Sequence, residues 1–371
     1  MPNHTPSEIL DSIFLEIYND RFLPYNRKIH YLYNCLLVNR LWCKNAISLL
    51  WSIAFAFNLK KTSKHRMTIV DSCLKFINKE QQTELLKSGI QIDATPSLFN
   101  YPSFIKDVKF EILLLFLRYW AFTRHSFAAD HNLILRILLE VLTENGTNLV
   151  CFVSDHLSLG LGTGVAENIR LPSKELTILG NNNIKNMFEN VNELWIGSRS
   201  LEKNFISVIA NICHNVKTMI VSFEPFDSYS LEEVSPENVS ELISSQKNLK
   251  SFTLISYRGT SYSFLNSLET QSHSLERVHI RSTFFKSGGP NLNGIAECKL
   301  LKALVIEDCE NITLKLVEPL MNAKFYMLTY VYFNCPYSSV CDEITEWAKC
   351  YDNEGKKMNY LYKGEKVYSR F

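Results

Sequence analysis

The composition of this chain narrows its possible functions before any motif is considered. It has 371 residues, 46% of them hydrophobic, and its 39 basic and 38 acidic residues leave a formal net charge of +1. At roughly 100–200 residues per domain, this length predicts two or three domains. The balanced charge excludes a general attraction to nucleic acid or to an acidic membrane, and we expect neither as a partner, although a local basic patch remains compatible with it.

The cysteines and the apolar segments indicate a cellular compartment. Ten cysteines are scattered singly, and none forms a C-x-x-C pair, so we expect reduced thiols that pack as small hydrophobic residues. The opening residues lack the basic segment and apolar run of a secretory signal. The two most apolar segments, 47–59 and 112–122, are shorter than the ~20 residues that a membrane span needs. These features predict a cytoplasmic and/or nuclear protein.

The first fifty residues predict three short helices. A capping pattern over 5–8 starts the first helix, which keeps apolar residues at helical spacing through Ile17. A polar loop over 19–28 precedes a second helix around 31–38, and a third continues through Leu50. A unit this small buries little core. We therefore expect its helices to need a partner surface, either the rest of the chain or another protein.

From residue 60 to residue 148 the pattern stays helical and predicts an all-helical bridge. Four amphipathic or strongly apolar segments carry this interpretation: 67–77, 82–90, 110–122 and 133–142. Asn145 and Gly146 then form a helix-stop pair. The end of the bridge is thus expected near residue 148.

Short apolar runs of strand type recur after residue 148, beginning with 149–153 and 176–179. Six later runs share the spacing apolar-x-x-apolar-x-apolar, and they start at residues 191, 216, 249, 275, 301 and 328. Successive starts differ by 25, 33, 26, 26 and 27 residues, and residues 222–236 form an expected loop insertion in the longest step. A period of roughly 20–29 residues with this spacing is typical of leucine-rich repeats.

The spacing also predicts which side chains are exposed. The fourth and sixth positions of each run enter the core, and the segments between runs, such as 205–213 and 239–244, form return helices. Each repeat leaves apolar faces bare until a neighbour stacks on it, so we expect a curved solenoid with strands on its concave side. The fold class is therefore α/β. Residues 341–371 break the period and are predicted to cap the last repeat, with a short hairpin over 360–371.

Charged and aromatic residues flank the core positions of the predicted strands. Arg277, His279 and Arg281 alternate along one strand. They form either a solvated charged face or a cationic patch on the concave side that holds an acidic or phosphorylated segment through bidentate arginine contacts. Three aromatic residues either anchor a substrate or are buried by the end of the solenoid: Trp195, Tyr330 and Tyr332.

Three stretches of the N-terminal helices resemble an F-box: Pro6-x-Glu8-Ile9-Leu10-x-x-Ile13-Phe14, Cys35-Leu36-Leu37-Val38-Asn39-Arg40-x-Trp42 and Leu50-Trp51. Thr5 stands where that family usually has leucine, and the loop before the second helix is longer than usual. The segment 301–313 is similar to the cysteine-containing class of leucine-rich repeats, with Cys309 at the ninth position. The resemblance divides the chain into an F-box-like unit (1–59), a helical bridge (60–148), leucine-rich repeats (149–340) and a cap (341–371).

The resemblance implies a substrate-recognition adaptor of a Skp–cullin–F-box (SCF) ubiquitin ligase. Such proteins dock on a Skp-type adaptor protein, and through it on a cullin–RING ligase, and hold an unknown protein substrate on their repeats. The alternative is a ligase-independent protein-binding scaffold. By this likeness the docking unit contains seven residues, some facing the adaptor and others the unit's own core: Pro6, Ile9, Leu10, Ile13, Val38, Trp42 and Trp51.

The sequence offers little support for an enzyme. The glycines of 160–164 have neither the dinucleotide-binding register nor the Lys-Ser/Thr of a phosphate-binding loop. His125 and His131 lie near Asp130, but their spacing fits no common zinc site. No G-x-S-x-G motif is present. We therefore predict no catalytic residues, no metal and no cofactor.

Overall fold

The computed structural model describes residues 7–20, 23–55, 63–93, 95, 97–125, 130–154, 178–197, 203–223, 236–256, 262–285, 291–335, 343–344 and 346–347. The chain divides into two compact units, Met1–Val150 and Cys151–Phe371. In the described part of the chain, no helix combines the length and the apolar character that crossing a membrane requires. The finer division into four segments stays a prediction, and the hairpin expected over 360–371 lies outside the described residues.

Three helices open the first unit: α1 (Ser7–Asn19), α2 (Tyr25–Leu36) and α3 (Arg40–Ser52). The predicted loop over 19–28 is too long, because α2 begins directly after Pro24. Pro24 is the N-cap of α2, and because proline has no backbone N–H it leaves no unpaired donor at that position. Asn39 caps α3 by accepting a hydrogen bond from the Trp42 amide at 2.9 Å.

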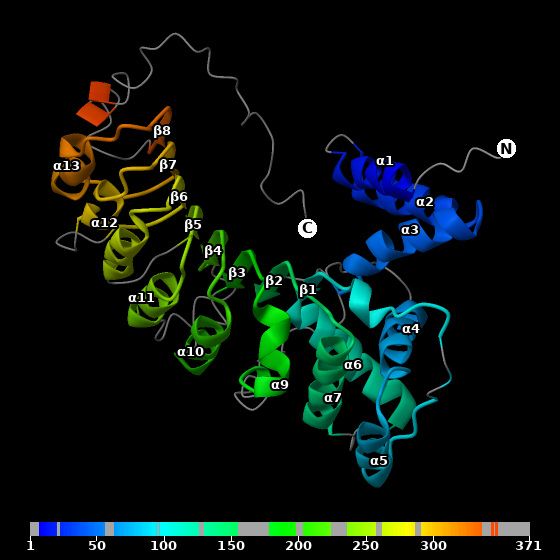
Figure 1. The fold of residues 1–371 in the computed structure, drawn as a ribbon. Helices are drawn as coiled ribbons and strands as arrows, with labels where there is room; N and C mark the ends of the chain where they lie inside the picture. The colour runs from blue at the N-terminus through cyan, green and yellow to red at the C-terminus, as the bar shows by residue number, and fades with distance from the viewer. Residues whose placement is uncertain are drawn as a thin grey trace. The chain divides into compact units, whose positions relative to one another are not determined.

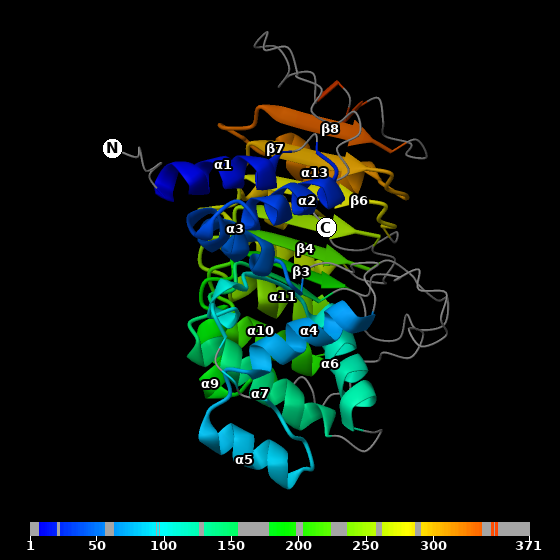
Figure 2. The same ribbon diagram turned by 90° about the vertical axis from the view of Figure 1, so that its right-hand side faces the viewer.

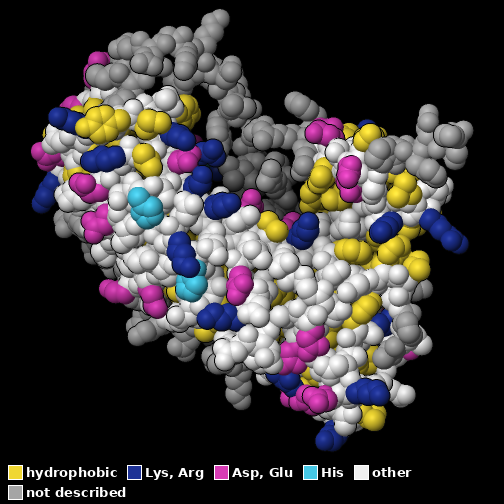
Figure 3. Space-filling model, viewed as in Figure 1, with side chains coloured by type: hydrophobic (Ala, Val, Ile, Leu, Met, Phe, Trp, Pro, Cys, Tyr) yellow, Lys and Arg dark blue, Asp and Glu magenta, His cyan; other side chains and the backbone are white. Residues whose placement is uncertain are grey.

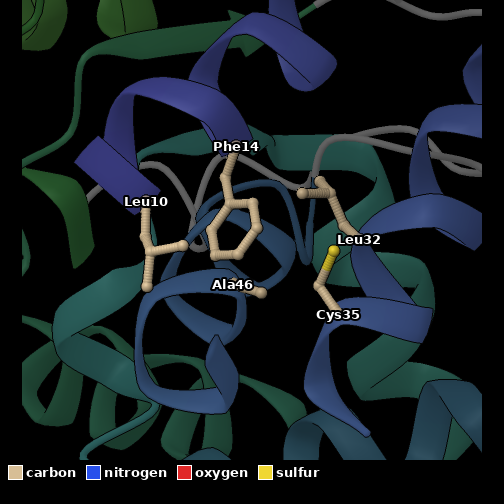
Figure 4. Close-up of a cluster of buried hydrophobic side chains, with 5 residues drawn as sticks. All are labelled: Leu10, Phe14, Leu32, Cys35 and Ala46. Carbon is tan, nitrogen blue, oxygen red and sulfur yellow. The ribbon is translucent and has the colours of Figure 1, made fainter. Parts of the chain in front are cut away.

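The three helices enclose a core of their own. Figure 4 shows five buried side chains pointing toward one another, two from α1, two from α2 and one from α3: Leu10, Phe14, Leu32, Cys35 and Ala46. Half-buried residues, among them Trp42 and Leu50, pack around this cluster. The i, i+4 spacing of the two α1 residues puts them on one face of that helix.

The rest of the first unit is mostly helical. It contains α4 (Ser63–Leu74), α5 (Lys79–Lys87), the 3₁₀ turn η1 (Pro102–Phe104), the short strand β1 (Asp107–Lys109), α6 (Phe110–His125) and α7 (His131–Glu144). The all-helical prediction is wrong at β1, where Val108 is buried and forms a parallel bridge with Phe55 after α3. Asp130 caps α7, accepting hydrogen bonds from two backbone amides. Gly146 has φ +75°, as its helix-stop role predicts.

Seven consecutive strands of one parallel sheet form the second unit (Figure 2). They are β2 (Cys151–Ser154), β3 (Glu193–Gly197), β4 (Thr218–Ser222), β5 (Ser251–Ile255), β6 (Arg277–Arg281), β7 (Ala303–Glu307) and β8 (Tyr330–Asn334). Each pairs with the next one in sequence. From β3 onward, every strand begins two residues after the start of a predicted run, which confirms the repeat spacing as a strand pattern.

Within this unit the described helices lie on one face of the sheet (Figure 1). They are α9 (Asn182–Lys185), η2 (Asn186–Phe188), α10 (Lys203–Ile212), α11 (Pro236–Ser244), η4 (Ser263–Gln271), α12 (Asn293–Ala296) and α13 (Leu314–Asn322). A strand expected over 176–179 is wrong at its described end, because Ile178 and Leu179 are helical. The alternation of a strand sends its core positions toward the helices, as buried Val278 and Ile280 show in β6.

The turn after each of three neighbouring strands repeats the same backbone geometry. Ser256, Ser282 and Asp308 follow β5, β6 and β7 directly and have φ values of 56°, 51° and 53°. Each donates its backbone N–H to the carbonyl oxygen of the last residue of the next strand, with N–O distances of 2.9, 3.0 and 2.8 Å. Positive φ is uncommon outside glycine, so its recurrence at one position indicates that successive repeats fold alike.

Two buried glutamines tie successive repeats together. The Gln271 amide nitrogen donates to the backbone carbonyls of Ile243 and Gln246, while its side-chain oxygen accepts the N–H of Leu249. One repeat earlier, the Gln246 side-chain oxygen accepts the N–H of Val216, and its amide nitrogen donates to the backbone carbonyl of Cys213. Buried backbone groups that lack a partner are costly, and these hydrogen bonds avoid that cost where the repeats stack.

Candidate protein-interaction surfaces

The first candidate surface is the outer side of α1. Leu10 and Phe14 point into the core, yet Ile9 and Ile13, one residue earlier in each case, are about half exposed, at 50% and 45%. A surface helix usually carries polar residues on the face opposite its buried stripe. Helix α1 therefore has more apolar surface than its own core uses.

A second group of exposed apolar side chains lies around the turn between α2 and α3. Leu37 and Val38 in the turn are 72% and 56% exposed, and Leu41 in the first turn of α3 is also exposed. Tyr31 and Tyr33 of α2 are exposed as well. Figure 3 shows apolar side chains gathered over the region of α1 to α3. Clustered exposed apolar residues mark interaction surfaces more often than isolated ones do.

The structure sorts the predicted docking residues into two groups. Ile9, Ile13 and Val38 are exposed, whereas Leu10 is fully buried and serves the core. Trp42 is half-buried, and its ring meets that of Phe14 in an edge-to-face arrangement with 5.3 Å between centroids. Trp51 stacks on Tyr101, with 4.2 Å between the ring centroids. Pro6 lies outside the described residues.

Sequence reasoning missed the exposure of Leu37 and Leu41. Both lie within or beside the stretch that carries the F-box resemblance, and apolar class alone does not tell an exposed leucine from a buried one. The Asn39 cap was the available signal. A cap at that position starts α3 at Arg40 and leaves the preceding Leu37 and Val38 in a turn, where fewer neighbours cover them.

The second candidate surface is the face of the sheet opposite the helices. The strand register aligns residues from β6, β7 and β8 in two rows on this face. One row contains Arg277, Ala303 and Tyr330, and the next contains His279, Val305 and Tyr332. The register thus brings Arg277 and His279 onto the same face as the two tyrosines, as the repeat spacing predicts.

Toward the other end of the sheet this face is apolar and covered. Trp195 is only 6% exposed and packs with Cys151 and Val153 of the neighbouring strand, while Ile220 contacts the same cluster. Of the two interpretations offered for Trp195, the structure thus shows a buried side chain. The exposed aromatic residue of the face is Tyr332, at 39%.

The expected cationic patch is divided by acidic neighbours. Glu307 lies beside Arg281 in the register, with 3.5 Å from the arginine Nε to the carboxylate, and it also contacts His279 Nε2 at 3.0 Å. Asp308 adds a second carboxylate at 4.0 Å from Arg281. Aligning the repeats places position 307 beside position 281, so this pairing could have been found from the sequence. No ion pair within the described residues involves Arg277, whose side chain is exposed.

Burial lowers the pKa of His279, and the charge of Arg281 lowers it further, whereas the hydrogen bond that the imidazole makes to the Glu307 carboxylate raises it. A folded-state pKa below the value of about 6.5 for unfolded histidine means that the folded protein binds fewer protons between the two values. His279 therefore contributes stability at higher pH and loses it as the pH falls through this window. We expect acidification from pH 7.5 to 5 to destabilise the wild type more than H279Q in denaturant titrations; equal losses would contradict the shift.

Candidate metal ligands do not cluster among the residues described. No group of three or more histidine, cysteine, aspartate or glutamate side chains there could hold a metal ion. Asp130 is committed to capping α7, and the glycines of 160–164 lie outside the described residues. The chain matches no protein-family model and no curated protein sequence. The described residues thus present exposed apolar side chains on α1 to α3, and a face with charged and aromatic side chains on the sheet of the second unit.

Proposed function

We propose that this protein is a substrate-recognition adaptor of a Skp–cullin–F-box type ubiquitin ligase. Its three N-terminal helices bind a Skp-type adaptor, and the face of its sheet opposite the helices (the open face) binds a protein substrate. The observation that carries the proposal is the surplus of apolar surface on α1 to α3. These helices complete a core of five residues and still expose Ile9, Ile13, Leu37 and Val38.

The second unit supports the other half of the proposal. Parallel strands at steps near 26 residues, in sequence order and with return helices on one face, suit a leucine-rich-repeat arrangement. The recurring positive φ at Ser256, Ser282 and Asp308 points the same way. Such arrays present a long surface to a partner.

An adaptor of this kind needs no catalytic residue of its own. It raises the rate of ubiquitin transfer by holding the lysines of its substrate close to the charged conjugating enzyme, which raises their effective concentration. The protein would therefore act without a cofactor, as a link between the ligase and a protein substrate. Such ligases work in the cytoplasm and nucleus, the compartments that the cysteine pattern favours.

The test is co-purification with a Skp-type adaptor. We expect the double variant I13E/V38E to lose the adaptor, since two exposed charges would have to be buried on binding. L86E is the matched control, because Leu86 is an exposed leucine on α5, outside the three-helix unit. Adaptor retained by I13E/V38E would contradict docking on this surface. A wild-type protein that binds no Skp-type adaptor would favour the ligase-independent scaffold.

A further inference from the structure

Positive charge gathers where strands β5 to β7 begin. Lys250, Glu276 and Lys302 each precede a strand by one residue, and Arg277 is the first residue of β6. Glu276 is held between the two lysines, at 3.5 Å from Lys250 and 2.8 Å from Lys302. Three cations and one anion leave this end of the strands with a net charge of +2. Arg277 is the cation of this group that the ion pairs of the described residues do not engage.

The opposite end of the same strands is not positive. Arg281 contacts both Glu307 and Asp308, and His279 shares Glu307 with it. With His279 neutral, one cation and two anions leave a net charge of −1. An anionic group that approaches this face is therefore drawn to Arg277 and repelled from the ends of β6 and β7.

Apolar surface begins next to Arg277 in the direction of β8. Small side chains separate the cation from the tyrosines, with Ala303 between Arg277 and Tyr330 and Val305 between His279 and Tyr332. Neighbouring strands lie about 4.8 Å apart, so Arg277 and the β8 tyrosines are separated by about 10 Å. A segment in the extended polyproline II conformation covers that distance in about three residues, at roughly 3.1 Å per residue, and its three-residue turn brings side chains i and i+3 onto the same side.

We infer that this face binds an extended protein segment that carries one anionic side chain and, three residues away, an aromatic or large aliphatic side chain. The anionic group, an acidic residue or a phosphorylated serine or threonine, contacts Arg277. The apolar side chain packs on Val305 and Tyr332. A nucleic acid fits less well, because its successive phosphates would have to pass Glu307 and Asp308. This inference rests on the proposed function and names the class of substrate segment.

A displayed library of random twelve-residue peptides, selected on the full chain, tests the inference. We expect enriched sequences to carry an acidic residue and an apolar residue three positions apart. A selected peptide is then synthesised with Glu, phosphoserine or Gln at the acidic position. Loss of the charge-assisted hydrogen bonds in the Gln peptide should weaken binding roughly tenfold, and the better of the other two identifies the source of the negative charge.

Variants of the protein locate the contact. R277Q should weaken binding of the charged peptide roughly tenfold and leave the Gln peptide unchanged. R281Q is the matched control on the same strand and should change binding less than about twofold, since Arg281 already has carboxylate partners. Enriched peptides without an acidic residue, no enrichment at all, or equal effects of the two variants would overturn the inference. Adaptor co-purification does not involve Arg277, so its outcome separates failure here from failure of the proposed function.

Discussion

Replacing Phe14 with alanine is expected to destabilise the three-helix unit by about 3–5 kcal/mol, the usual range for a buried phenylalanine. Phe14 is fully buried between α1, α2 and α3, and its ring and that of Trp42 meet edge to face. A cluster of five buried residues has little stability to lose. We therefore expect F14A to unfold this unit near physiological temperature and to abolish adaptor binding as a consequence.

Helical circular dichroism during thermal melting, together with limited proteolysis of the N-terminal sixty residues, measures this loss. I13A is the matched control, because Ile13 is the preceding residue on the same helix and is 45% exposed. It should melt within a few degrees of the wild type while still weakening adaptor binding. If F14A and I13A melt alike, the packing assigned to α1 is wrong.

Replacing Gly294 with alanine is expected to destabilise the second unit. A β-carbon at this position would lie 2.4 Å from the Leu265 carbonyl oxygen and 2.5 Å from the Asn266 α-carbon, both backbone atoms of η4. Neither can move without shifting a whole element, so we expect destabilisation of about 1–3 kcal/mol or more. Glycine in a helix is otherwise improved by alanine, by roughly 0.5–1 kcal/mol.

Whether G294A lowers or raises the free energy of unfolding therefore tests the close approach of α12 to η4. Denaturant unfolding of G294A should show a lower midpoint, whereas N293A, an exposed neighbour in the same short helix, should be close to the wild type. A G294A variant more stable than the wild type would show that α12 and η4 do not approach as closely as described.

The strands of the second unit were predictable from the sequence because their signal is repeated. In the runs that begin at residues 249, 275 and 301, the fourth and sixth positions enter the core in each repeat, so the apolar pattern recurs with the structure. Strands β5, β6 and β7 accordingly begin two residues after each start. The glutamines were not foreseen. They lie in the segments between apolar runs, where Gln246 and Gln271 pair with backbone groups that no side-chain pattern reveals.

The sequence predicted several residues of the candidate surfaces but not which of their side chains are exposed. Apolar spacing placed Ile9, Leu10 and Ile13 on a helix, but exposure depends on where α2 and α3 pack, and adjacent residues 9 and 10 end on opposite sides. The start of α2 depended on Pro24, which the polar composition of the segment concealed. Likewise, the alternation of side chains along β6 placed Arg281 on the open face, but the ion pair that neutralises its charge depends on Glu307 in the next repeat.

We propose that this chain links a substrate to a cullin through a Skp-type adaptor. The most direct test mixes the purified full chain with a purified cullin, with and without a Skp-type adaptor, and follows the complex by size-exclusion chromatography. We expect the chain to co-elute with the cullin only when the adaptor is present, and the I13E/V38E variant not to co-elute. A chain that elutes alone in both mixtures would contradict it.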